Sequence, residues 1–284
     1  MPTNNTLAER LIDSVKSLPP APRILPELLV LLADGQASAD RVAELITFDP
    51  ALTAKVLQVC NSVLFRGNQP VHDVSGAIVR LGFSQIYQIV ATVVGERTLG
   101  GTQPGYGIGQ GELWQHSAVT AVAAKIIAQE AGTDENLSFT AALLHDLGKL
   151  ALSTALEGAY AEVTRQTEAA NHSFLEAERD IIGVDHAEVG GCLLERWKFP
   201  DYLVQAVRHH HDPMRAKPHE VLTAGVHLAD MLAHLMGHGY GHQANAVRAR
   251  TESLALLELT QRDVERLMLK TQAALDSSQL LNST

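Results

Sequence analysis

The side chains of this sequence with the clearest chemical potential are histidines and aspartates that stand inside apolar stretches. His145 and Asp146 are adjacent in a run of alanines and leucines, and His116 and Asp230 lie in similar apolar segments. Burying a carboxylate among leucines is costly unless the carboxylate is paired or binds a cation. Imidazole and carboxylate together suit ions such as Zn, Mn, Fe or Mg. Each residue alone could be a hydrogen-bonded core histidine or a capping aspartate, but together the four predict a shared divalent-metal site.

Other histidines and one glutamate could complete such a site. His186 stands at a predicted helix start, and the run His209–His211 stands at a predicted helix end. Both have a structural alternative, because a helix start is capped by hydrogen bonds and histidines near a helix C-terminus favour the macrodipole. Glu112 lies four residues before His116 and therefore on the same helix face. The further candidate ligands are His186 and His210, with Glu112, His209 and His211 as weaker ones. Which histidine of the run faces the site is left open.

The elements that must position these residues are helices. Apolar residues recur with a 3.6-residue period through most of the chain, as at Leu28, Leu31 and Leu32. Asp49 followed by Pro50 has the pattern of a helix N-cap with proline at the first helical position. Alternating strand patterns are scarce. The sequence therefore predicts an all-α fold.

A glycine-rich segment divides the chain. Residues 100–107 contain four glycines and one proline, and such a stretch cannot continue a helix at reasonable cost. We therefore predict an N-terminal helical lobe over 1–99, a linker over 100–109 and a second helical lobe over 110–284. The second lobe holds twelve of the thirteen histidines. A polar stretch over 237–250 is predicted to be a long loop.

Composition excludes several classes of function. The net charge is −10, from 22 basic and 32 acidic residues, which argues against nucleic-acid binding and against docking on an anionic membrane. The two cysteines, Cys60 and Cys192, are far apart and form no CxxC motif, so we expect no disulfide framework and a reducing cytoplasm. We find no uninterrupted apolar stretch of about 18 residues, so no transmembrane helix is expected.

The histidines and aspartates of the predicted metal site resemble a known sequence pattern. His116, His145-Asp146 and Asp230 match, in order, the histidine, His-Asp pair and distal aspartate of the HD superfamily of metal-dependent phosphohydrolases. Other segments resemble one bacterial signalling branch of it, the HDOD (HD-related output domain) proteins. This resemblance covers nearly the whole chain, with a core region over 15–240. Its segments are 18–22, 49–57 with Asn61-Ser62, and 77–82.

The resemblance implies an all-helical protein with an N-terminal lobe and a C-terminal HD-like helical bundle. It also implies a regulatory output role, in a family whose HD sites are widely regarded as degenerate. This sequence departs from that expectation because it keeps the four HD-pattern residues. His186, the run 209–211 and Glu112 resemble additional ligands of HD-GYP phosphodiesterases. The segment His210–Met214 lacks the Gly-Tyr-Pro that names that branch, so we do not expect cyclic-di-GMP hydrolysis.

Two functional hypotheses follow. In the first, the protein is a signalling module without efficient catalysis, which acts by binding a signalling protein or a small nucleotide-like ligand, with homodimerisation left open. In the second, it is a metal-dependent phosphohydrolase or phosphodiesterase, with Asp146 and Lys149 as candidate catalytic residues and Lys149 as a phosphate contact. In the first hypothesis the histidine cluster is structural or binds a metal that has a structural or sensory role.

Overall fold

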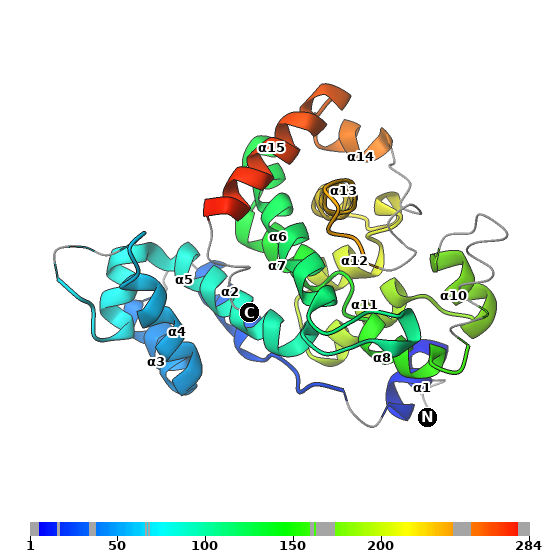
Figure 1. Ribbon diagram of the computed structural model, residues 1–284, viewed down its shortest axis with the longest axis horizontal. Helices are drawn as coiled ribbons and strands as arrows, with labels where there is room; N and C mark the ends of the chain where they lie inside the picture. Colours follow the sequence, from blue (N-terminus) through cyan, green and yellow to red (C-terminus); the bar gives the residue numbers. More distant parts are fainter. Residues whose placement is uncertain are drawn as a thin grey trace. The chain divides into compact units, whose positions relative to one another are not determined.

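The computed structural model describes residues 6–15, 18–33, 38–65, 67, 69–159, 162, 174–240 and 251–277. Within these ranges the chain forms α-helices and two short 3-10 helices, and no β-strand is present. The all-α prediction is therefore confirmed. The helices form two compact units, one of residues 21–97 and the other of residues 1–20 with 98–284 (Figure 1).

The smaller unit contains α2 (Ile24–Ala33), α3 (Ala39–Thr47), α4 (Pro50–Cys60) and most of α5 (Val74–Leu99). Asp49 caps α4 as predicted, because its Oδ1 accepts hydrogen bonds from the first backbone N–H groups of that helix and Pro50 needs none. The Arg97 guanidinium also binds Asp49, at 2.6 Å, and this hydrogen bond lowers the pKa of the Asp49 carboxyl. The cap therefore ties α4 to the end of α5.

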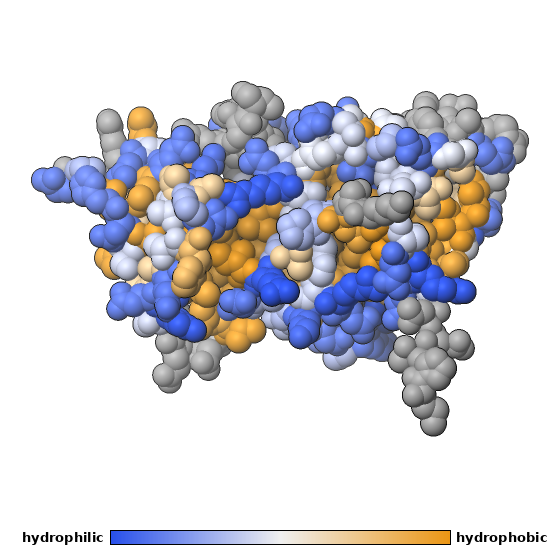
Figure 2. All heavy atoms as spheres, turned by 90° about the horizontal axis from the view of Figure 1, so that it is seen from below, coloured by the Kyte–Doolittle hydropathy of each residue, from blue (hydrophilic) through white to orange (hydrophobic). Residues whose placement is uncertain are grey.

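Helix α5 is the one described helix that is long and apolar enough, by length and composition, to cross a membrane. However, 61% of its apolar window is buried inside the protein. Its backbone also leaves the helical conformation at Gly82, where φ is 78° and ψ is 163°. On the face shown in Figure 2, hydrophobic residues reach the surface in patches bordered by hydrophilic ones. We assign α5 to the protein core.

The larger unit carries every residue of the predicted site. Its central helix α6 (Glu112–Ala131) packs against α7 (Glu135–Leu144), α13 (Glu220–Leu235) and α15 (Gln261–Ser277) (Figure 1). α11 (His186–Arg196) packs on α12 (Asp201–Arg208) and on α8 (Lys149–Leu156). The remaining elements are α1 (Leu7–Ser14), η1 (Pro104–Tyr106), α10 (Phe174–Ile182), η2 (Pro213–Arg215) and α14 (Thr251–Leu256).

Two segments of this unit, helix α1 and the glycine-rich segment, pack on helices of the C-terminal part of the chain. Helix α1 packs on α11 and α8 through buried Leu11 and Ile12, and Arg196 binds Asp13 at 2.7 Å. The glycine-rich segment contains η1, which packs against α8 and buries Tyr106. The division at 1–99, 100–109 and 110–284 stays a prediction. The predicted loop over 237–250 lies largely outside the described residues, which include only its first four positions.

Candidate metal centre

Five separate parts of the larger unit bring histidines and aspartates to one buried place. His116 comes from the first turns of α6, and His145 and Asp146 directly follow α7. His186 is the first residue of α11, whose N-cap is Asp185. His210 and His211 follow α12, and Asp230 lies on α13. Of these, His116, His145, Asp146, His186, His210 and Asp230 are each at most 3% exposed.

The four HD-pattern residues form the first group of ligand atoms. His116 Nε2 lies 3.3 Å from His145 Nε2 and 3.2 Å from Asp230 Oδ1, and the last two atoms are 3.6 Å apart. Asp146 Oδ2 lies 3.4 Å from His145 Nε2 and 3.8 Å from His116 Nε2. A tetrahedron whose corners lie about 2.1 Å from a central zinc-like ion has edges of about 3.4 Å. The five distances above lie close to this edge length, as expected of ligand atoms that can share one ion.

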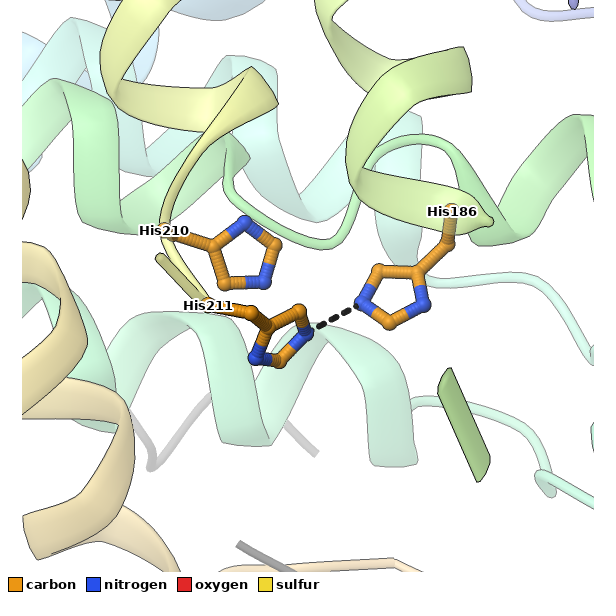
Figure 3. A group of neighbouring side chains, drawn as sticks. All are labelled: His186, His210 and His211. Atoms are coloured by element: carbon orange, nitrogen blue, oxygen red, sulfur yellow. Dashed lines mark hydrogen bonds between the residues drawn. The ribbon is translucent and has the colours of Figure 1, made fainter. Parts of the chain in front are cut away.

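Three histidines form the second group. His186, His210 and His211 point toward one another from the start of α11 and from the segment after α12 (Figure 3). His186 Nε2 lies 2.9 Å from His211 Nε2 and 3.3 Å from Asp146 Oδ1. Asp146 therefore faces the first group with one carboxylate oxygen and the second group with the other. Both His210 and His211 of the histidine run are brought to the site.

The hydrogen bonds at Nδ1 decide which ring nitrogen of each histidine carries the proton. A carbonyl or carboxylate oxygen can only accept a hydrogen bond, so in each of the following four pairs the histidine Nδ1–H is the donor. The pairs are His116 with His238 O (2.9 Å), His145 with Ala142 O (2.6 Å), His210 with Val207 O (2.7 Å) and His186 with the Glu178 carboxylate (2.8 Å). In their neutral forms all four rings therefore present an Nε2 lone pair to the centre.

Two of the converging atoms have no hydrogen-bond partner. They are Asp230 Oδ1 and His210 Nε2, both buried. Burial lowers the pKa of His116, and burial with the charges of His145 and His186 lowers the pKa of His210 to about 3. These two rings are therefore neutral at pH 7 and cannot donate from Nε2. These two unpartnered atoms, an imidazole nitrogen and a carboxylate oxygen, fit a cation, and the set of imidazoles and carboxylates suits a divalent metal such as Zn, Mn or Fe.

Asp146 also has two partners that belong to neither group. Lys149 Nζ lies 2.8 Å from Asp146 Oδ2 and 2.6 Å from the Tyr240 hydroxyl, and this hydroxyl also donates to Asp146. Burial by itself raises the pKa of Asp146. The positive charge of Lys149, together with His145, outweighs burial and holds this pKa well below its usual range. Asp146 is therefore an ionised carboxylate.

The structure adds site residues that were not among the candidates selected from the sequence. Glu178, Tyr106 and Tyr240 are each at most 4% exposed and bind residues of the two groups or each other. His234 Nε2 lies 3.4 Å from Asp230 Oδ1. The spacing of His234 from Asp230, four residues on one helix face, could have indicated it. Tyr106 and Tyr240 reach the site through contacts across 72 and 94 residues, whereas Glu178 contacts His186 eight residues away.

Two weaker candidates do not join either group. Glu112 is exposed, and its Oε2 accepts a hydrogen bond from the backbone N–H of Gly109 at 2.7 Å. His209 is partly buried at the C-terminus of α12, and burial lowers its pKa. Lys149 is not solvated, since it is 3% exposed and bound to Asp146.

Gly148 shows how closely the elements around the centre approach. A Cβ atom at this position would lie 1.9 Å from His186 O and 2.6 Å from Gly190 N. Because both are backbone atoms, we expect Gly148→Ala to lower the free energy of unfolding by about 3 kcal/mol. The matched control is Gly225→Ala on α13, where an added Cβ meets nothing within 4 Å. Chemical denaturation of both variants measures the difference, and equal stabilities would contradict the described packing.

Comparison with known proteins decides the family. The HDOD domain family matches residues 18–213 of the chain. The chain belongs to the HDOD family. An HDOD domain protein of unknown function from Geobacter sulfurreducens is 26% identical, with a TM-score of 0.67 over 96% of this chain and 93% of that one. A candidate signal transduction protein from Marinobacter aquaeolei is 23% identical and shares the fold, with a TM-score of 0.74 over 95% of this chain and 63% of that one.

Curated relatives of this HDOD protein are longer. An uncharacterised protein from Treponema pallidum is 26% identical over 79% of this chain and 44% of its own length. Ribonuclease Y from Campylobacter curvus is 28% identical over 70% of this chain and 32% of its own length. The chain thus spans less than half the length of these two relatives.

Proposed function

We propose that this HDOD protein is a bacterial signalling module in which a divalent metal has a structural or sensory role rather than supporting efficient hydrolysis. The observation that carries the proposal is the combination of a complete ligand set with its burial. His145, Asp146 and Asp230 are each at most 3% exposed, so a phosphate ester would have little access to these three residues. Lys149 and Tyr240 further engage the Asp146 oxygen that faces the first group.

The proposed partners follow from the family and from the charge of the chain. We propose a cytoplasmic protein that acts through a signalling protein or a small nucleotide-like ligand. A net charge of −10 disfavours nucleic acid as the partner, because phosphate binding needs a basic surface. A second copy of the chain is the further partner to test, by measuring the mass in solution.

The alternative function is a metal-dependent phosphohydrolase or phosphodiesterase. It is supported by the four retained HD-pattern residues and by the similarity to ribonuclease Y over 70% of this chain. A bound divalent ion supplies acidity to a coordinated water and neutralises developing charge. Within the chain, Asp146 would hold that ion, and Lys149 would have to exchange its 2.8 Å contact with Asp146 for a phosphate.

A metal assay combined with a hydrolase screen tests the proposal. Protein purified without chelator is analysed for metals, and its melting temperature is measured with added Mn²⁺, Fe²⁺ or Zn²⁺. The screen uses phosphomonoesters, cyclic nucleotides and short RNA. We expect a bound ion, a higher melting temperature and no metal-dependent turnover. Turnover that depends on the metal and disappears in Asp146→Ala would establish the alternative instead.

A further inference from the structure

Glu178 is a fully buried carboxylate beside the centre, with an exposed fraction of 0%. It lies on α10, and neither of its oxygens is a member of the two ligand groups. Oε1 accepts a hydrogen bond from the Tyr106 hydroxyl at 2.8 Å, and Oε2 accepts one from the backbone N–H of His186 at 2.8 Å. The His186 Nδ1–H points at both oxygens, at 2.9 and 2.8 Å. Three donors thus converge on one carboxylate.

Glu178 differs from the acceptors that hold the other rings. The Nδ1–H groups of His116, His145 and His210 each donate to a backbone carbonyl, which is part of the main chain and uncharged. Among these four rings, His186 alone is held by a charged side chain. A carboxylate acceptor fixes the tautomer and orientation of a ligating imidazole and raises its basicity. A neutral carbonyl makes a weaker hydrogen bond to the imidazole than a carboxylate does, so it raises the basicity of the ring less.

We infer that Glu178 is a positioning residue that locks His186 in the Nδ1–H form and strengthens its Nε2 as a metal ligand. Nε2 is then the free lone pair, 3.3 Å from Asp146 Oδ1. The His211 Nε2–H can donate to it across 2.9 Å until a cation takes that place. The part of the inference that concerns metal affinity rests on the proposed metal centre, whereas the part that concerns the tautomer does not.

The test is the tautomer of each histidine, read from ¹⁵N chemical shifts of the metal-free, histidine-labelled protein at alkaline pH. In the wild type we expect His186 to have a protonated Nδ1 and an unprotonated Nε2. In Glu178→Ala we expect His186 to shift to the Nε2–H form that imidazole favours in water. His145 and His210 are internal controls, because their carbonyl acceptors remain. A loss of packing alone would not change one ring and spare the other two.

Metal affinity is the second measurement, by calorimetric titration with Mn²⁺ and Zn²⁺. We expect Glu178→Ala to weaken binding by about 10- to 100-fold, the usual effect of removing such a partner of a ligand. Ser153→Ala is the matched control: it removes a buried hydrogen bond between Gly105 and α8 without touching Glu178. We expect that control to leave both affinity and tautomers unchanged. Should Glu178→Ala fail to fold, Glu178→Gln keeps the volume and an oxygen that can accept from His186 Nδ1–H but removes the charge, so we expect it to weaken metal binding without changing the tautomer.

The outcomes separate this inference from the proposed function. An unchanged His186 tautomer in Glu178→Ala overturns the inference, as does an unchanged metal affinity in Glu178→Gln. A changed tautomer with unchanged affinity overturns the role of Glu178 in metal binding. A wild type that binds no ion while its tautomer follows Glu178 supports the positioning role and contradicts the metal centre itself. A change in both readouts supports the inference in full.

Discussion

Replacing Lys149 with methionine is expected to lower the free energy of unfolding of the metal-free protein by about 3–5 kcal/mol. Lys149 is 3% exposed and Asp146 is 2% exposed, and their charged atoms are 2.8 Å apart. Methionine keeps most of the volume of lysine but leaves the buried Asp146 carboxylate without its cation. The cost is the desolvation of this carboxylate, which His145 offsets only in part. Urea denaturation of protein treated with chelator measures the effect.

The matched control for this prediction is Lys270→Met. Lys270 binds Glu130 at the surface, where its side chain is 49% exposed, so we expect a loss of at most about 1 kcal/mol. A divalent ion should also rescue Lys149→Met more than it stabilises the wild type, because the ion replaces the missing positive charge beside Asp146. Equal losses for Lys149→Met and Lys270→Met would contradict the buried ion pair.

Asp146→Asn is expected to weaken metal binding by at least about 100-fold, which corresponds to about 2.7 kcal/mol. Asp146 is the one residue whose two oxygens face both groups, at 3.4 Å from His145 Nε2 and 3.3 Å from His186 Nε2. Asparagine keeps the shape but removes the charge and turns one oxygen into a donor. Calorimetric titration of Mn²⁺ and Zn²⁺ into chelator-treated protein measures the loss.

Glu112→Gln is the control for Asp146→Asn. Its position before His116 makes it a ligand candidate by sequence, but the structure places its carboxylate on the backbone N–H of Gly109. We expect an unchanged metal affinity for this variant. If Glu112→Gln weakened metal binding as much as Asp146→Asn, the exclusion of Glu112 from the metal ligands would be wrong.

The sequence predicted the helices and the main candidate ligands because both leave local signals. Asp49-Pro50 marks a helix start through capping chemistry that acts within one turn. A charged Asp146 in a run of leucines is an anomaly that burial makes costly, so it could be noticed without a structure. Which histidines of the run face the site depends on where α12 ends, and the structure brings both His210 and His211 to it.

The rest of the site depends on contacts between residues that are distant in sequence. Glu178 meets Tyr106 across 72 residues, and Tyr240 meets Asp146 across 94. No local period or motif marks such pairs, because only the tertiary fold brings their residues together. Similarly, α1 packs on α11 and α8 through its apolar face. The sequence of such a face does not indicate which helices it contacts.

The most direct test of the metal centre is an anomalous difference map from crystals of protein purified without chelator and supplied with Mn²⁺ or Zn²⁺. The proposed metal centre predicts a peak at about 2.0–2.2 Å from Nε2 of His116 and His145 and from oxygens of Asp146 and Asp230. A map without a peak among these atoms, from protein that also binds no added ion in solution, would contradict it.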